Sequence, residues 1–403
     1  MRESFKIIKG GGVCSPLGFL ASGVHCGIKK NGHPDLALVL SERYAEVAAA
    51  FTTNQVKAAP VKVSMTKVKN HMVRGVVINS GNANACTGLK GLEDAQQMVR
   101  WAAEACDAEE KDFLVCSTGR IGVALPMKKV AFGIKKAAKA LSKSNGKRAA
   151  EAIMTSDTFP KEIAVSMYLG EHKITIGGMA KGAGMIHPNM ATMLACITTD
   201  VKIERQLLRR VVADAVEKTF NRISVDGDTS TNDTVVVLAN GAAENPILRA
   251  FHPQFKLFER ALLFVMRSLA QMIVADGEGI TKVVHLTVKG ARNAQDAKRA
   301  AHAVARSMLV KTSWCGEDVN WGRLMDALGY SEAKVREELV EIFYNGHLVV
   351  QNGVRSRVPD AKIKNVVKQK SFSINIDLHL GIGEYSLTTT DLTEEYVRLN
   401  KGE

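Results

Sequence analysis

The strongest constraint on how this chain folds lies in residues 181–200, where a glycine-rich turn leads directly into an apolar run. The turn reaches Ala191 and Thr192, and the apolar residues 193–197 follow at once. A short apolar run bounded by turn residues is typical of a buried β-strand. The sequence therefore predicts that Thr192 opens a buried strand immediately behind a glycine-rich loop.

This arrangement suits a threonine that cleaves its own chain. Cutting the Ala191–Thr192 bond would leave Thr192 with a free α-amine beside its own hydroxyl. An α-amine titrates near pH ~8, so it can act as the base that activates the hydroxyl. The same residues also fit an ordinary loop that enters a core strand, and the pattern by itself favours that simpler interpretation.

Length and composition indicate a soluble globular protein. A chain of 403 residues can bury a sizeable core and is long enough for two domains or lobes. Its longest apolar stretch, residues 261–274, contains Arg267 and is too short to cross a bilayer. The N-terminus lacks the apolar core of a signal peptide. Seven cysteines without a CxxC pair argue against disulfides or structural zinc, so we expect a cytoplasmic protein without a metal.

The net charge of +13 is concentrated before Thr192, where 26 basic and 15 acidic residues give +11. Residues 126–148 contain eight cations and no acid. Four apolar residues recur there at helical spacing: Val130, Ile134, Ala138 and Leu141. We expect an amphipathic helix whose lysine-rich face is solvated. Attraction of anionic substrates or of an acidic partner is the alternative, and nucleic-acid binding is poorly supported because aromatic residues are sparse.

Strand-like and helical runs alternate along the chain. The predicted strands are residues 36–40, 75–79, 113–116, 163–168, 192–198, 234–239, 283–288 and 373–378. The predicted helices are residues 93–106, 128–141, 204–220, 255–273 and 294–308. Many of the strands alternate in polarity or lie next to turns. This pattern favours an α/β fold with mixed sheets layered with helices over a purely parallel wound sheet.

Several motifs appear in one order along nearly the whole chain. They are GFLASGVHCGIKKNGHPDLALVLSE (18–42), FTTNQVKAAPV (51–61), NSGNANACTG (79–88), STGRIG (117–122), MTSDTFPK (154–161), ATML (191–194), VDGDTSTNDTV (225–235), ADGEGITK (275–282) and GEDVNWGR (316–323). The set resembles the ornithine acetyltransferase family, the bifunctional glutamate N-acetyltransferases of arginine biosynthesis.

The resemblance implies that Thr192 becomes the catalytic N-terminus of a second segment after self-cleavage. An alpha segment, residues 1–191, and a beta segment, residues 192–403, would then stay interleaved in one fold. That fold would be a layered α/β fold with its own topology and with chemistry similar to that of N-terminal-nucleophile hydrolases. The family further implies a heterotetramer of two alpha and two beta segments. No cofactor is implied, although acetyl-CoA serves as a second acetyl donor in bifunctional members.

The apolar strand of residues 113–116 runs into Ser117, Thr118 and Gly119. A strand that ends in glycine exposes backbone N–H groups, and the Thr118 hydroxyl is a further donor. Taken alone, this tripeptide would be an ordinary turn. The resemblance implies that Thr118 and Gly119 form the oxyanion hole, which stabilises the negative oxygen of an acyl-transfer transition state.

The resemblance implies substrate contacts at five positions: Thr155, Lys181, Thr192, Glu278 and Asn400. Lys181 would supply a cation near the nucleophile, and Glu278, between two glycines, could hold the ornithine ammonium. Without the resemblance, a surface lysine and a solvated turn glutamate would be favoured. Family members usually continue past the matching asparagine to a terminal Ser or Thr that also touches substrate, whereas Glu403 is the last residue here.

Two polar motifs are predicted to be scaffolding around the pocket. They contain Asn79, Asn82, Asn84, Asp226, Asp228 and Asp233. The aspartates lack the spacing and the distal glutamate of an EF-hand, so no cation loop is expected. His187 could assist self-processing, but packing of the loop is the favoured interpretation.

The implied reaction moves an acetyl group from N2-acetyl-L-ornithine to L-glutamate through acetyl-Thr192. The products are L-ornithine and N-acetyl-L-glutamate, and the kinetics should be ping-pong. Two alternatives stay open. One is a self-processing aminopeptidase or amidase that passes the acyl group to water, and the other is a non-enzymatic basic binding protein that uses residues 126–148. The expected partners are small-molecule substrates and the chain's own segments, without nucleic acid or membrane.

The Thr192→Ala variant should remain one uncut chain of 43.6 kDa and should lose all acetyl transfer, because the nucleophile and its base are the same residue. The wild-type chain should instead give two fragments of 191 and 212 residues on a denaturing gel. A Thr192→Ala protein that is cleaved or active would refute self-processing at this bond.

Overall fold

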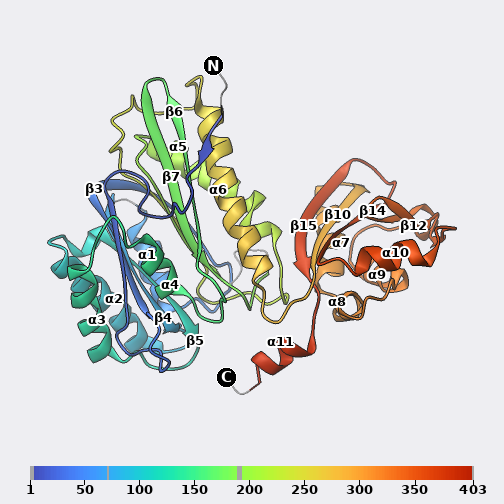
Figure 1. The fold of residues 1–403 in the computed structure, drawn as a ribbon, viewed down its shortest axis with the longest axis horizontal. Coiled ribbons are helices and arrows are strands. Elements are labelled where there is room, and N and C mark those ends of the chain that lie inside the picture. Colours follow the sequence, from blue (N-terminus) through green and yellow to red (C-terminus); the bar gives the residue numbers. More distant parts are fainter. Residues whose placement is uncertain (1–3, 70–71, 188–192, 402–403) are drawn as a thin grey trace. The chain divides into compact units, whose positions relative to one another are not determined.

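The computed structural model describes residues 4–69, 72–187 and 193–401 (Figure 1). The chain divides into two compact units. Of the described residues, the first unit holds 4–69, 72–183, 193–221 and 229–273, and the second holds 184–187, 222–228 and 274–401. Each unit layers helices on a mixed β-sheet, so the predicted α/β class is confirmed. None of the helices in the described ranges has the length and apolarity needed to cross a bilayer.

The first unit is built on a nine-stranded sheet within the described residues. The strand order is β1-β6-β7-β8-β9-β3-β4-β5, and β2 also pairs with β3. The pairs β4–β5 and β8–β9 are parallel, whereas the other neighbours are antiparallel. The strands are β1 (Lys6–Ile7), β2 (Phe19–Val24), β3 (Leu36–Phe51), β4 (Val73–Asn82), β5 (Phe113–Arg120), β6 (Lys161–Leu169), β7 (His172–Lys181), β8 (Leu194–Thr199) and β9 (Thr234–Ala239).

In the part of the chain that the structure describes, six helices belong mainly to this unit. They are α1 (Ala59–Lys67), α2 (Gly88–Ala105), α3 (Met127–Lys139), α4 (Gly146–Ile153), α5 (Arg205–Lys218) and α6 (Phe255–Ala275). Helix α3 buries Val130, Gly133, Ile134 and Ala137 and carries its lysines on the other side. The predicted amphipathic helix is therefore confirmed, although it ends at Lys139 rather than at residue 141.

Strands β8 and β9 lie in the centre of the sheet and are buried along their whole length. On one face, Leu194 and Cys196 pack in a core cluster that includes Ile153 of α4. On the other face, a side-chain carbon at Gly178 of β7 would lie only 3.1 Å from both Ile197 and Leu269 of α6. Because both faces are covered, β8 and β9 are continuous apolar runs rather than alternating ones.

Strand β3 joins two parts of this sheet. Its register to β4 shifts between Leu40 and Ala45, so residues 41–44 form an irregular bulge. Before the bulge β3 pairs with β2 and β4, and after it residues 46–51 pair with β9.

The second unit contains a six-stranded sheet, with the order β13-β12-β11-β14-β10-β15 among its described residues. Its strands are β10 (Val283–Ala291), β11 (Glu341–Tyr344), β12 (His347–Gln351), β13 (Val354–Arg355), β14 (Ser371–Asp377) and β15 (Gly383–Thr390). Its helices are α7 (Ala294–Arg306), α8 (Met308–Cys315), α9 (Trp321–Gly329), α10 (Asp360–Val367) and α11 (Glu394–Leu399). Short 3-10 turns occur at Glu110–Asp112, Phe220–Arg222 and Glu337–Leu339.

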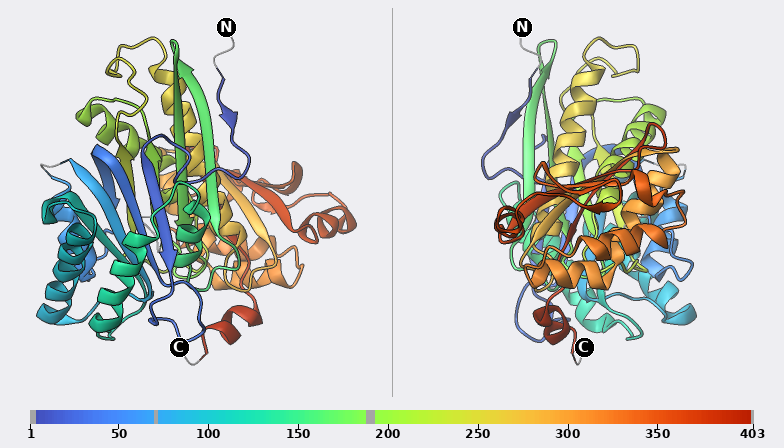
Figure 2. Two further views of the ribbon diagram at one scale, coloured as in Figure 1. Left: turned by 60° about the vertical axis from the view of Figure 1, so that its left-hand side comes forward. Right: turned by 90° about the vertical axis from the view of Figure 1, so that its right-hand side faces the viewer.

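One face of the second sheet is buried and the other is exposed. Strand β14 alternates strictly between buried and more exposed residues, and its apolar side packs with helices α7–α10 in one core cluster (Figure 2). Trp314 contacts Phe372 edge to face, with 6.3 Å between ring centroids, and Tyr344 stacks on Phe372 at 6.2 Å. This one-sided pattern is typical of a sheet that carries helices on a single face.

Each of the predicted strands and helices has a counterpart. Strand β8 begins at Leu194, and the predicted start at Thr192 lies outside the described residues. The sheet of the first unit combines strands from both sides of the 191/192 bond, because β7 pairs with β8. The division of the chain at that bond stays a prediction about cleavage.

A buried ion pair fixes the start of β6. Lys161 is fully buried, and its Nζ lies 2.7 Å from Oδ1 of Asp157. Burial alone would raise the pKa of Asp157, but the Lys181 and Lys161 ammonium groups and the Gly182 amide outweigh it and lower this pKa to about 2. Asp157 is therefore ionised in the folded protein and holds buried positive charge in place.

The Asp157→Asn variant should lose about 3–5 kcal/mol of unfolding free energy, because it leaves a buried ammonium without its carboxylate. The contribution of Asp157 is present above pH ~4, the usual carboxyl range, and is lost as the pH falls through about 2. Urea unfolding at neutral pH measures the difference. The control is Glu259→Gln, which breaks the surface pair with Lys256 and should cost less than about 1 kcal/mol. Equal effects of the two substitutions would contradict the role of Asp157.

Candidate active site

The predicted cleavage pair, Ala191 and Thr192, lies outside the described residues. The backbone amide of Met193, the first described residue after this pair, is fixed by a hydrogen bond: its N–H donates to Oδ1 of Asp233 at 2.9 Å. Asp233 is completely buried, and burial raises the pKa of its carboxyl well above the usual range. The first residue after the junction is thus anchored to a buried acid.

A second aspartate holds the chain before the junction, within the second unit. The backbone N–H groups of Met185 and Ile186 both donate to the Asp226 carboxylate, the latter at 2.9 Å. Burial raises the pKa of Asp226 to about 6. His187 follows, with Nδ1 3.2 Å from Oγ of Ser224, and burial lowers its pKa to about 4, so the ring is neutral at pH 7. These contacts agree with the predicted scaffolding role of the aspartate motif and with loop packing of His187.

Thr118 and Gly119 lie where the parallel strands β4 and β5 end together. Gly81 of β4 pairs with Gly119 of β5, and a side-chain carbon on Gly119 would be 2.3 Å from the Gly81 carbonyl carbon. Gly119 also has φ 130°, a conformation that other residues rarely adopt. Glycine is therefore required here. Thr118 is buried while Gly119 is exposed, so this strand end presents backbone to its surroundings.

Lys181 at the end of β7 reaches the same place. Its Nζ lies 3.3 Å from Oγ1 of Thr118 and 4.0 Å from the Asp157 carboxylate. Because the ammonium can only donate, the Thr118 hydroxyl keeps its proton for another acceptor. Lys181 is only 3% exposed, so the surface position that the residues alone favoured is wrong.

Asp157 connects Thr155, another predicted substrate residue of the first unit, to Lys181. The Thr155 N–H donates to Oδ2 of Asp157 at 2.9 Å, and the Gly182 N–H donates to Oδ1 at 2.7 Å. Asp157 thus brings Thr155, Lys181 and, through Lys181, Thr118 into one cluster. Sequence reasoning missed Asp157, although it lies in the quoted motif MTSDTFPK and is the only acid in it.

A pocket of about 320 Å³ opens beside this cluster. It is lined by Lys29, Asn31, His33, Pro34, Glu151, Met154, Thr155, Asp157 and Pro160. Thr155 is exposed to it, whereas Asp157 forms part of its buried wall. Of the residues predicted to contact substrate, Thr155 lines this pocket.

Glu278 and Asn400 lie together in the second unit. The Asn400 side-chain amide donates to Oε2 of Glu278 at 2.9 Å, and it is held by a second bond to the Tyr396 carbonyl oxygen at 2.9 Å. The Glu278 carboxylate packs on Gly184, where an added side-chain carbon would lie 2.3 Å from Oε2. The structure therefore pairs two predicted substrate residues beside the glycine-rich approach to the junction.

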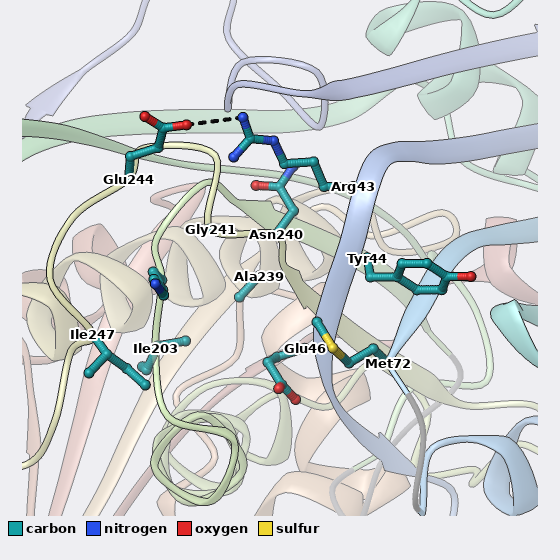
Figure 3. A pocket seen from close by; sticks show the side chains of 11 residues that line it. Arg43, Tyr44, Glu46, Met72, Ile203, Ala239, Asn240, Gly241, Glu244 and Ile247 are labelled. Atoms are coloured by element: carbon teal, nitrogen blue, oxygen red, sulfur yellow. Dashed lines mark hydrogen bonds and ion pairs between the residues drawn. The ribbon is translucent and has the colours of Figure 1, made fainter.

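A larger pocket, of about 550 Å³, lies elsewhere in the first unit (Figure 3). It is lined by Arg43, Tyr44, Glu46, Met72, Lys202, Ile203, Ala239, Asn240, Gly241, Glu244 and Ile247. Arg43 is already paired with Glu244 at 3.1 Å. The pocket adjoins Ala239 at the far end of β9, whereas Thr234 at the start of β9 bonds to Met193. It contains none of the predicted site residues.

The seven cysteines are free thiols. Cys196, four residues past the predicted nucleophile, is 2% exposed, and burial raises the pKa of its thiol. It is therefore a core residue of β8, as the strand-like pattern predicted.

Comparison with known proteins identifies the family. The ArgJ family matches residues 20–402. The arginine biosynthesis bifunctional protein ArgJ of Geobacter sulfurreducens is 49% identical over 384 residues, which cover 95% of this chain and 98% of the relative. The protein of the same name from Caldanaerobacter subterraneus is 48% identical over 391 residues, 96% of each chain.

Among solved structures, the chain is similar to ornithine acetyltransferase complexed with ornithine from Mycobacterium tuberculosis. The two are 40% identical, and the TM-score is 0.43. The match covers 46% of this chain and 98% of that one. The sequence matches extend over nearly the whole chain, and they confirm the resemblance that the motifs indicated. The chain belongs to the ArgJ family.

Proposed function

We propose that this chain transfers the acetyl group of N2-acetyl-L-ornithine to L-glutamate and releases L-ornithine and N-acetyl-L-glutamate. As a member of the ArgJ family, the chain is an acyltransferase of arginine biosynthesis. The observation that carries the proposal is the family match over residues 20–402, together with relatives that are named bifunctional proteins of this pathway.

The first stage is self-cleavage. Thr192 Oγ attacks the Ala191 carbonyl carbon, and the peptide nitrogen of Thr192 leaves as an amine. Water then hydrolyses the resulting ester, which frees Thr192 as a new N-terminus. The anchored Met193 amide supports this step, because it holds the residue after the nucleophile in one position.

The second stage is acetyl transfer. The Thr192 α-amine takes the proton of its own hydroxyl, and Oγ attacks the acetyl carbonyl of the donor. The tetrahedral intermediate collapses as the ornithine nitrogen accepts a proton and leaves. Glutamate then attacks the acetyl-Thr192 ester with its neutral amine and departs as N-acetylglutamate, while Thr192 recovers its proton.

Thr118 and Gly119 act as donors to the oxyanion. The support is geometric: Lys181 donates to Thr118 Oγ1, so the hydroxyl proton is free to point toward a developing negative charge. The nearby ammonium also makes that hydroxyl a stronger donor. Thr155, Lys181, Glu278 and Asn400 contact substrate in this proposal.

Several finer points belong to the same proposal. The enzyme needs no cofactor, and acetyl-CoA serves as a second acetyl donor, which the word bifunctional in the relatives' names supports. The two segments assemble as a heterotetramer in the cytoplasm, a reducing compartment that suits seven free thiols. The family match does not favour the hydrolytic enzyme or the basic binding protein.

Incubation of the wild-type protein with N-acetylornithine alone should leave one acetyl group on the fragment that starts at Thr192, because donor and acceptor use the site in turn. Mass spectrometry detects this intermediate. Added glutamate should remove it and give N-acetylglutamate and ornithine in equal amounts. Release of free acetate instead would favour the hydrolase, and an unmodified fragment would refute the covalent mechanism.

The Thr118→Val variant should lose roughly 10²–10³-fold in kcat, the usual effect of removing one oxyanion donor. The assay uses processed protein, so that an effect on self-cleavage is not counted. Thr66→Val is a matched control, since Thr66 bonds only locally to the Val63 carbonyl oxygen in the described structure. A processed Thr118→Val enzyme with normal turnover would remove Thr118 from the mechanism.

A further inference from the structure

A buried carboxylate organises the loop that carries Lys29. Asp35 is completely buried, and its two oxygens accept four backbone N–H groups. The donors are Cys26 (2.7 Å), Gly27 (3.0 Å), Ile28 (2.7 Å) and Lys29 (3.0 Å). Charge-assisted bonds of this kind are stronger than neutral ones. The backbone of Lys29 is therefore held in one position before any ligand arrives.

The side chain of Lys29 lies against the strand ends that carry the oxyanion donors. A side-chain carbon on Gly81 would be 3.1 Å from Cγ of Lys29, and Gly81 is in turn the direct partner of Gly119. The lysine stem thus lies against Gly81 at the end of β4, beside the strand that carries Gly119. Beyond the stem, Lys29 lines the 320 Å³ pocket together with Thr155 and Asp157.

The carboxylates near Lys29 already have partners of their own. Lys161 and Lys181 share the Asp157 carboxylate, and the Asp35 carboxylate is occupied by the four loop amides. The Lys29 ammonium donates to the Pro34 carbonyl oxygen at 2.8 Å, which is a neutral acceptor, and forms no ion pair within the described part of the chain. The other acid on the lining, Glu151, is paired with Arg148 at 3.9 Å. A ligand carboxylate would give the Lys29 ammonium a charged partner.

We propose that Lys29 binds a carboxylate of the amino-acid substrates, and that it is a further substrate-binding residue of the transfer site. The inference rests on the proposed function, which supplies the ligands. Both substrates carry an α-carboxylate, and glutamate also carries a side-chain carboxylate. Lys29 is half-buried and lines the pocket together with Thr155, so its ammonium can meet a carboxylate that binds there.

The electrostatic surroundings agree with this role. Burial lowers the pKa of Lys29 to about 8; Asp35 and Asp157 oppose the shift, and Lys181 adds to it. Glu151 and His33 are the other ionisable groups that face the pocket. A bound carboxylate would favour the charged ammonium. Because the free enzyme loses this charge as the pH rises through about 8, carboxylate binding should weaken above that pH.

The test compares three variants of the processed enzyme: Lys29→Met, Lys29→Arg and Lys30→Met. Lys29→Met should raise KM by on the order of tenfold or more with a smaller change in kcat, because a charged hydrogen bond to substrate is lost. Lys29→Arg should restore most of the affinity. Lys30→Met removes the same charge from the exposed neighbouring residue and should leave both constants unchanged.

The KM values measured for the two substrates show which carboxylate Lys29 binds. If Lys29 binds the shared α-carboxylate, KM should rise for both N-acetylornithine and glutamate. If it binds the side-chain carboxylate, only the glutamate KM should rise, and acetylation of Thr192 by N-acetylornithine should stay normal.

An unchanged KM for both substrates in folded, processed Lys29→Met would overturn the proposal. Should that variant fail to fold, the pH dependence of Lys29→Arg decides instead. The ratio of the wild-type kcat/KM to that of Lys29→Arg should fall above pH about 8, because the guanidinium stays charged while the Thr192 amine titrates in both proteins. Identical profiles would overturn the role of Lys29. Failure of the proposed function is a separate result, because wild-type protein would then make no N-acetylglutamate.

Discussion

The Asp157 carboxylate is the interaction on which the first unit's candidate site depends. It neutralises Lys161 at the start of β6 and Lys181 at the end of β7, and it accepts the Thr155 and Gly182 amides. A single buried acid thus ties a turn, two antiparallel strands and two cations together. Burying an ammonium without a carboxylate partner is unfavourable by several kcal/mol, so Asp157 stabilises Lys181 in its position beside Thr118.

The strand ends at Thr118 and Gly119 depend on backbone rather than on charge. Two glycines, Gly81 and Gly119, let the parallel strands β4 and β5 approach so closely that no side chain fits between them. The close approach places the Thr118 hydroxyl and the exposed Gly119 backbone at one edge. Lys29 then lies over Gly81, held by the four amides that bind Asp35. Buried carboxylates therefore position Lys29 through Asp35, and Lys161 and Lys181 through Asp157.

The scaffold around the junction follows the same physical principle. Asp233 binds the amide that follows the predicted cleavage bond, and Asp226 binds amides that precede it, each within its own unit. In both cases burial raises the pKa of the carboxyl, and backbone N–H groups favour its charged form. Hydrogen bonds from backbone amides to these two carboxylates therefore fix the chain on each side of the junction.

The sequence by itself determined the family, the α/β class and the main helices and strands. The order of the motifs along the chain indicates the family. Burial on one face of a helix such as α3, or on both faces of a strand such as β9, produces a pattern of apolar residues that the sequence shows directly. Only the tertiary structure decided that Lys181 is buried, that Asp157 binds it and that Lys29 lies over Gly81. These facts join residues that are far apart in the chain, such as Lys29 and Gly119, and sequence spacing carries no information about such distances. Charge pairing and close packing in three dimensions set them, and both depend on how the sheet is ordered.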